Sequence, residues 1–92
     1  MAPSPVVELN RAVAVTMADG PAAGLALVER VAASGQLDGY PYLHATRADL
    51  LRRLGDRASA VLAYRRAIEL TANEPERAFL EGRIAELGRA TA

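Results

Sequence analysis

The stretch "LRRLGDRASAVLAYRRAIEL", residues 51–70, decides the fold. Its Gly-Asp pair separates two helical segments, because glycine commonly ends a helix and aspartate caps the next one. After that break, Ala60, Tyr64 and Ala67 recur at helical spacing. Small residues at such steps let two helices approach closely. The stretch therefore predicts the turn and the second half of an antiparallel helical hairpin.

Helix-ending and helix-starting residues of the same kind divide the rest of the chain. Proline occurs at positions 5, 21 and 41, after Ser4, Gly20 and Tyr40, and proline at the first helical position favours a helix start at each. We predict a single all-α domain over residues 1–92 with about five helices in a right-handed array. It comprises hairpin one (5–34), hairpin two (41–72) and a closing helix (74–88). No segment alternates with the period of a β-strand.

The apolar residues of each expected helix recur at three- and four-residue steps, which predicts one buried face per helix. The expected core residues are Val6, Leu9, Val13 and Met17; Leu43, Leu50 and Leu54; Ala60, Tyr64, Ala67 and Ile68; and Phe79, Leu80, Ile84 and Leu87.

The two hairpins resemble tetratricopeptide (TPR) units. Gly20 and Gly55 are 35 residues apart, and TPR units repeat about every 34 residues. The second hairpin carries TPR-like small residues at Ala48, Ala60 and Ala67 beside Tyr64. It departs from the TPR pattern because His44 replaces a large aromatic residue, Arg47 replaces leucine and Pro75 comes late. Two units fall short of the roughly three repeats that such folds need, so neighbouring protein or a homodimer is expected to supply packing.

The composition excludes several classes of protein. The 11 basic residues, all arginine, balance 11 acidic ones, so no net field attracts nucleic acid or a membrane surface. The chain has no cysteine, which excludes disulfides and thiolate metal sites and favours a reducing cytoplasm. It also lacks a signal peptide and any apolar run near the roughly 20 residues that span a bilayer. We therefore expect a cytoplasmic protein with no membrane partner.

A longer resemblance covers residues 4–87. The segments "SPVVELNRAVA" (4–14) and "ADLLRRLG" (48–55) are its most specific parts. The chain resembles the C-terminal TPR-like extension of a group of bacterial extracytoplasmic-function (ECF) RNA polymerase sigma factors, found mainly in GC-rich bacteria such as actinobacteria. Nothing in it resembles the sigma regions that melt and read the promoter. The resemblance implies a regulatory extension that does not bind DNA by itself.

That resemblance also implies partners. The family's extension is thought to control sigma activity in place of an anti-sigma factor. The expected partners are therefore the sigma core regions or RNA polymerase, with a co-encoded DGPF-type protein as a further candidate. The alternative is a free-standing TPR adaptor that binds an extended peptide and has no link to transcription.

Asn10 is the first candidate site residue. Its spacing places it among the apolar residues of the first helix. A buried amide needs a partner or costs about 1–3 kcal/mol. We expect either a hydrogen bond between helices or a groove-lining amide that holds a peptide backbone.

The arginines of the second hairpin form a second candidate site. The structural interpretation is a solvent-exposed helix face with ion pairs between residues four positions apart, Asp49–Arg53 and Arg65–Glu69. The functional interpretation is a surface for an acidic partner. In that case Arg47 lines the groove, and the outer charged surface comprises Arg52, Arg53, Arg65 and Arg66.

Tyr40, Pro41, Tyr42 and His44 form an aromatic and polar cluster between the hairpins. Either they pack and cap a helix, or they are a partner's contact point, with Tyr42 and His44 in the groove. His44 has no second histidine or cysteine at ligand spacing, so we expect no metal site.

The sequence contains no recognisable catalytic set. "DGPAAG" (19–24) follows a helix rather than a strand and lacks the lysine of a phosphate loop, so it predicts a tight helical turn. We therefore expect a non-enzymatic interaction domain without a cofactor.

Overall fold

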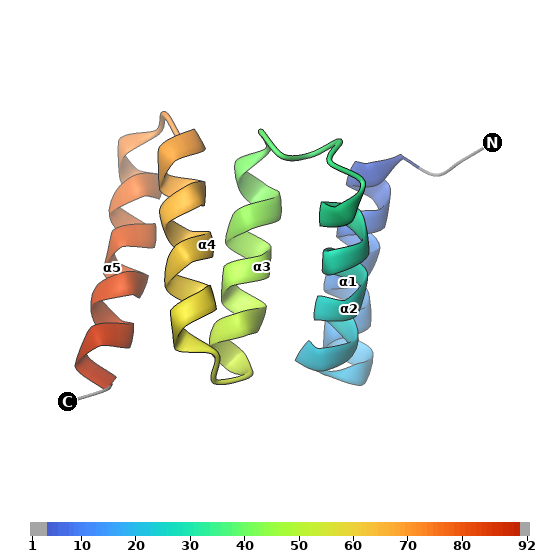
Figure 1. Cartoon of the computed structure of the whole chain (residues 1–92), viewed down its shortest axis with the longest axis horizontal. Helices are drawn as coiled ribbons and strands as arrows, with labels where there is room; N and C mark the ends of the chain where they lie inside the picture. The colour runs from blue at the N-terminus through green and yellow to red at the C-terminus, as the bar shows by residue number, and fades with distance from the viewer. Residues whose placement is uncertain (1–3, 91–92) are drawn as a thin grey trace.

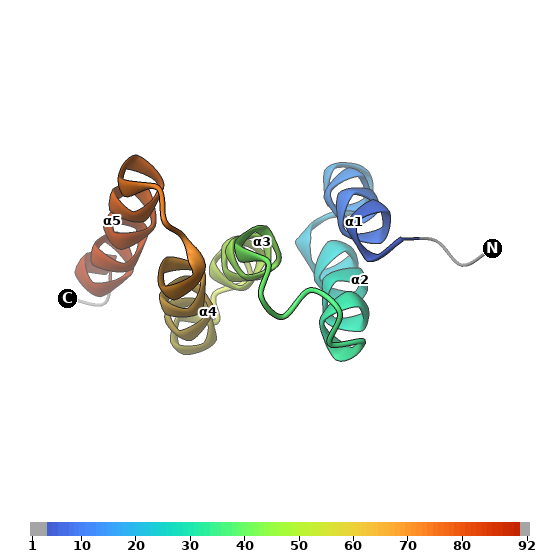
Figure 2. The ribbon, with the colours of Figure 1, turned by 90° about the horizontal axis from the view of Figure 1, so that it is seen from above.

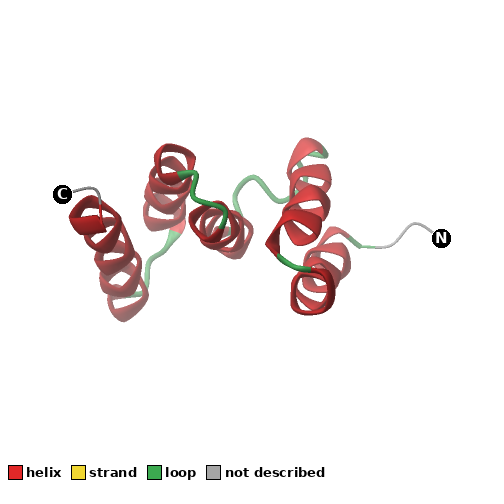
Figure 3. Ribbon diagram, turned by 90° about the horizontal axis from the view of Figure 1, so that it is seen from below, coloured by secondary structure: helices red, strands yellow, loops and turns green. Residues whose placement is uncertain are grey.

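The computed structural model describes residues 4–90, and the regular elements in that range are all α-helices (Figure 3). This confirms the all-α prediction and the expected five helices. Their bounds are α1 Pro5–Asp19, α2 Pro21–Ala33, α3 Pro41–Arg53, α4 Arg57–Leu70 and α5 Glu74–Ala90.

The helices form a row that measures 47 × 30 × 19 Å, with each helix packed mainly on its neighbours in sequence (Figure 1). Seen from above, α1 and α5 lie on one side of the row and α2 and α4 on the other, with α3 between them (Figure 2). Side chains of α1, α3 and α5 line a groove on one side of the row, which we call the hollow side.

Local signals start the helices where the sequence predicts. The Ser4 side chain accepts a hydrogen bond from the Val7 amide at 3.3 Å, and Asp56 accepts one from the Ser59 amide at 3.1 Å. These caps satisfy amides that have no partner inside the helix. Between paired helices, Gly20 and Gly55 adopt φ values of 95° and 86°, a region that favours glycine.

The buried residues form two clusters, and α3 contributes to both. The first cluster joins α1, α2 and α3, and the second joins α3, α4 and α5. The fold therefore has no single central core. The first cluster comprises Leu9, Ala12, Val28, Val31, Leu43 and Leu50, and the second comprises Ala48, Leu51, Ala60, Ala63, Tyr64, Ala67, Leu80 and Leu87.

Small residues set the distance between paired helices. A Cβ atom at Gly24 would lie 1.7 Å from Thr16 Oγ1 and 3.2 Å from the Ala12 carbonyl oxygen. Glycine is therefore required at this point of α2. Ala48 and Ala60, in α3 and α4, are fully buried.

The hairpins repeat with an interval of 36 residues. This interval separates Pro5 from Pro41 and Pro21 from Arg57, the first residues of the corresponding helices. It is one residue longer than the Gly20–Gly55 spacing. The expected right-handed sense of the array stays a prediction.

The predicted core was correct for α4 and partly wrong elsewhere. Tyr64 is buried as expected, together with Ala60 and Ala67. In contrast, Met17 is 86% exposed and Phe79 is 57% exposed. Both belong to apolar stripes that face the hollow of the row rather than a neighbouring helix. Val6 and Leu54 are also exposed.

Candidate functional site

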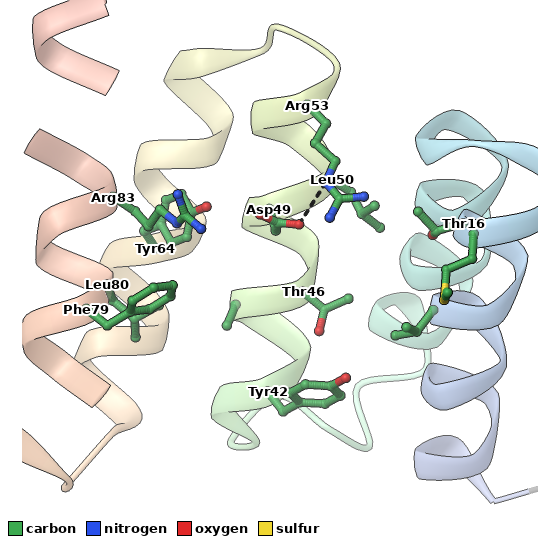
Figure 4. A pocket seen from close by; sticks show the side chains of 13 residues that line it. Thr16, Tyr42, Thr46, Asp49, Leu50, Arg53, Tyr64, Phe79, Leu80 and Arg83 are labelled. Atoms are coloured by element: carbon green, nitrogen blue, oxygen red, sulfur yellow. Dashed lines mark ion pairs between the residues drawn. The ribbon is translucent and has the colours of Figure 1, made fainter. Parts of the chain in front are cut away.

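A groove of about 560 Å³ occupies the hollow side of the row (Figure 4). Its walls come from α1 and α5, and its floor comes from α3 with one residue of α4. The described residues that line it are Val13, Thr16, Met17, Tyr42, Ala45, Thr46, Asp49, Leu50, Arg53, Tyr64, Phe79, Leu80 and Arg83.

Helical spacing brings these side chains to one side. Residues three and four apart share a face of an α-helix. Val13 and Met17 therefore form the stripe of α1, and Phe79 and Arg83 form that of α5. On α3 the corresponding stripe begins at Tyr42 and continues through Thr46, Asp49 and Arg53.

Three large apolar side chains are exposed to solvent in this groove. They are Met17 of α1, Tyr42 of α3 and Phe79 of α5. Single exposed apolar residues are ordinary, but a group that shares one concave surface marks an interaction site. Methionine and aromatic side chains are also well suited to partners of varied shape.

Asp49 lies between two arginines at the centre of α3. Its Oδ1 atom is 2.5 Å from Arg52 Nη2, and its Oδ2 atom is 3.0 Å from Arg53 Nε. Arg52 also donates a hydrogen bond to the Tyr64 hydroxyl at 3.3 Å. The hydrogen bond to Asp49 and, to a smaller extent, the one to Tyr64 raise the pKa of Arg52. One carboxylate thus serves two guanidinium groups, which leaves positive charge beside the groove.

The opposite wall carries a second arginine beside an aromatic ring. The Arg83 guanidinium carbon lies 4.9 Å from the centroid of the Phe79 ring, and Arg83 Nη1 lies 3.3 Å from Glu86 Oε2. The stacked guanidinium covers part of an exposed ring. The charged residues that line the groove are Asp49, Arg53 and Arg83, so its surface favours an acidic partner.

The predicted groove residues are divided between two places. Tyr42 lines the groove. His44 and Arg47 line a shallower hollow of about 360 Å³ between α2 and α3. There Arg47 forms a bidentate ion pair with Glu29, and His44 Nε2 lies 2.8 Å from the Asp38 carbonyl oxygen. Within the structure these two residues join the hairpins rather than line the groove.

Asn10 does not occupy a buried face. Its side chain is exposed, so the expected buried amide is a wrong prediction. The physical reason is that the stripe of Val6, Val13 and Met17 faces the hollow side of the row. The helical spacing places Asn10 on this stripe, about one turn from the residues that line the groove.

The outer arginines have different partners. Asp49–Arg53 forms as predicted, whereas Glu69 pairs with Arg66 at 3.3 Å. The predicted Arg65–Glu69 pair is therefore wrong, because the three-residue spacing brings Arg66 to the same carboxylate. Arg65 and Arg66 are exposed on α4 and are not among the described residues that line the groove.

The aromatic cluster at the junction is a packed pair. The rings of Tyr40 and Tyr42 meet edge to face, with centroids 6.1 Å apart. Pro41 begins α3 between them. The cluster therefore packs at the start of α3, where Tyr40 is the N-cap residue and makes no side-chain capping hydrogen bond. Tyr42 lines the groove, and its contact with a partner stays a prediction.

Sequence reasoning missed the two walls of the groove. Met17 and Phe79 were predicted in the core, and Thr16 and Arg83 were not singled out. The four-residue spacing of Phe79 and Arg83 is a usable signal, because it allows a cation–π contact on an exposed helix face.

Within residues 4–90, no helix is both long and apolar enough to cross a membrane. The described histidine and acidic side chains also form no group of three or more that could hold a metal ion.

Comparison with known proteins finds a relative of this chain. The chain is 46% identical over 85 residues to an uncharacterized protein of Rhizobium meliloti (strain 1021), which covers 92% of the chain and 20% of that protein. The chain therefore spans about a fifth of the length of the curated relative it matches. No family model matches the chain, and no solved structure matches it.

Proposed function

We propose that this chain is a non-catalytic regulatory domain of the kind found at the C-terminus of ECF sigma factors, and that it acts by docking its groove on the sigma core regions or on RNA polymerase. The observation that carries the docking role is the groove itself. It exposes Met17, Tyr42 and Phe79 together on one concave surface. The link to transcription rests on the sequence resemblance of residues 4–87.

The shape of the groove favours a protein partner over a small substrate. It is open along the row and lined by residues of α1, α3, α4 and α5. Of its charged groups, Asp49 and Arg53 already bind each other, and Arg83 pairs with Glu86. A site for chemistry would hold titratable groups in an enclosed pocket, whereas this surface suits an apolar segment flanked by acidic residues.

Removal of the domain tests the regulatory role. The chain is placed at the C-terminus of a full-length ECF sigma factor, in place of that factor's own extension, and promoter output is compared with and without it. The proposal expects a change in output. Unaltered output at equal protein levels would refute the regulatory role.

Groove variants test the docking surface in the same assay. The double variant Met17→Asp and Phe79→Asp places charge on both walls without touching a buried residue. Leu62→Asp is the matched control, because Leu62 is also exposed, lies on α4 and is not among the described groove residues. The double variant should reproduce the effect of deletion, and the control should leave output unchanged.

The alternative adaptor role has its own signature. The purified chain would then bind neither the sigma core nor RNA polymerase, and it would bind acidic extended peptides through the same groove. Binding of purified sigma core that the groove variant abolishes supports the first proposal and excludes this one.

A further inference from the structure

The outer end of the row has an unusually exposed face on α1. Val7 of α1 and Leu43 of α3 occupy corresponding positions, 36 residues apart. Leu43 is 1% exposed, whereas Val7 is 57% exposed. Leu50 of α3 is likewise buried, and the corresponding Ala14 of α1 is exposed.

The difference follows from what lies before each helix. α3 rests against α2, the helix before it. Within residues 4–90, α1 is the first helix of the row and no other helix lies on its far side (Figure 2). The same backbone position is therefore a packing contact in α3 and a solvent-exposed face in α1.

Arg47 and Arg11, which occupy corresponding positions of α3 and α1, differ in the same way. Arg47 of α3 pairs with Glu29 of the preceding α2. The corresponding Arg11 of α1 has a side chain that is 68% exposed, and its carboxylate contact is Glu8 of its own helix, at 4.0 Å. Arg11 also lines a hollow of about 480 Å³ between α1 and α2.

We propose that the face of α1 formed by Val7, Arg11 and Ala14 is a stacking site for a further α-helix that carries an apolar stripe and a carboxylate opposite Arg11. α2 provides this chemistry to α3, with Val28 and Val31 in the shared cluster and Glu29 as the carboxylate. The occupant is a helix that repeats these features, as the second helix of an additional hairpin would. This inference is independent of the proposed groove partner.

A second copy of this chain fits the site poorly. α2 is already covered by α3, and α4 is covered by α5. In α4 the position that corresponds to Glu29 is Arg65, which would place an arginine against Arg11. Like charges at that contact disfavour head-to-tail self-association.

An in-register duplication tests the site. A second copy of residues 5–40 is inserted directly before Pro5, so that its α2 precedes α1 as the native α2 precedes α3. Because the chain has no cysteine, Val7→Cys in the inner copy is a single thiol probe. Its modification rate should fall about tenfold or more relative to the same substitution in the unextended chain.

Matched variants make the result specific. Leu62→Cys, far from the junction, should react at the same rate with and without the added hairpin. Glu29→Arg in the added copy should restore part of the reactivity at position 7. An unchanged rate for Val7→Cys in the extended chain would overturn the proposal. Concentration-dependent protection of this thiol in the unextended chain would also overturn it, in favour of a second copy.

Discussion

The two hairpins share a backbone arrangement but fill it with different side chains. In the first hairpin, the Thr16 hydroxyl donates to the Ala12 carbonyl at 2.8 Å and fills the space beside Gly24. In the second, Arg52 stands at the position of Thr16 and turns toward Asp49 and the Tyr64 hydroxyl. Gly24 in α2 thus leaves room for the Thr16 side chain of α1. Its counterpart Ala60 in α4 has no such contact to accommodate, because the Arg52 side chain of α3 points toward Asp49 and Tyr64.

The two hairpins repeat the same helix geometry with different side chains. Val28 and Tyr64 occupy the same position of their helices, and both are buried. Tyr64 has the largest volume of the fully buried side chains and reaches the floor of the groove, whereas Val28 lies in the first cluster. The second hairpin thus carries both the largest fully buried side chain and the Asp49–Arg53 ion pair that lines the groove.

The largest expected difference between the hairpins concerns these two residues. Tyr64→Ala should lower the free energy of unfolding by about 3–5 kcal/mol, as truncation of a large buried ring does. Val28→Ala removes two methyl groups and should cost about 2 kcal/mol. Urea unfolding measures both, and equal costs would contradict the account. Tyr64→Phe, which loses only the Arg52 contact, should cost about 1 kcal/mol.

Substitution of Gly24 should have the next largest effect on the free energy of unfolding. The sign of that effect shows whether α1 and α2 are in close contact there. On an uncrowded helix, Gly→Ala stabilises by about 1 kcal/mol. Gly24→Ala should instead destabilise the chain by about 1–3 kcal/mol, because its Cβ meets Thr16. Thr16→Ala in the same chain should recover most of the loss. A Gly24→Ala variant with a raised melting temperature would show that the helices are not in close contact there.

The contribution of a helix cap to the free energy of unfolding should depend on where the helix lies in the row. Asp56 caps α4 between two packed helices, and Ser4 caps α1 at the open end. Asp56→Ala should cost about 1 kcal/mol of unfolding free energy. Ser4→Ala should cost less, because the first turn at the open end can fray without disturbing a neighbour. Amide hydrogen exchange in the first turns of α1 and α4 measures the difference, and greater loss at α1 would contradict it.

The smallest expected effect is the ion pair between the hairpins. A double-mutant cycle of Glu29→Gln and Arg47→Gln should give a coupling of about 0.2–1 kcal/mol, since both side chains are partly exposed. The coupling should weaken at high salt. A coupling that does not change with ionic strength would argue against a solvent-exposed pair.

Much of the fold could be predicted because its boundaries depend on local chemistry. Pro5, Pro21 and Pro41 begin helices as expected, and Gly20 and Gly55 end them in the left-handed region. The buried residues of α4 were also predictable, since this helix contacts α3 on one side and α5 on the other.

The groove was harder to predict from the sequence. Periodicity shows that Val13 and Met17 share a face, but it does not show whether another helix covers that face. Leu9 of α1 is buried as predicted, but the rest of the packed face of α1 comes from Ala12 and the partly buried Thr16, small or polar residues that an apolar pattern overlooks. Exposed stripes toward the hollow side and core stripes have the same spacing, so only the arrangement of the helices separates them.

The proposed docking through the concave groove, rather than through the outer arginine surface, is tested most directly by thiol protection in the cysteine-free chain. Met17→Cys and Leu62→Cys variants are labelled with and without purified ECF sigma core and RNA polymerase. The account predicts that the partner slows labelling at position 17 and leaves position 62 unchanged. Protection at position 62 with full reactivity at position 17 would contradict it.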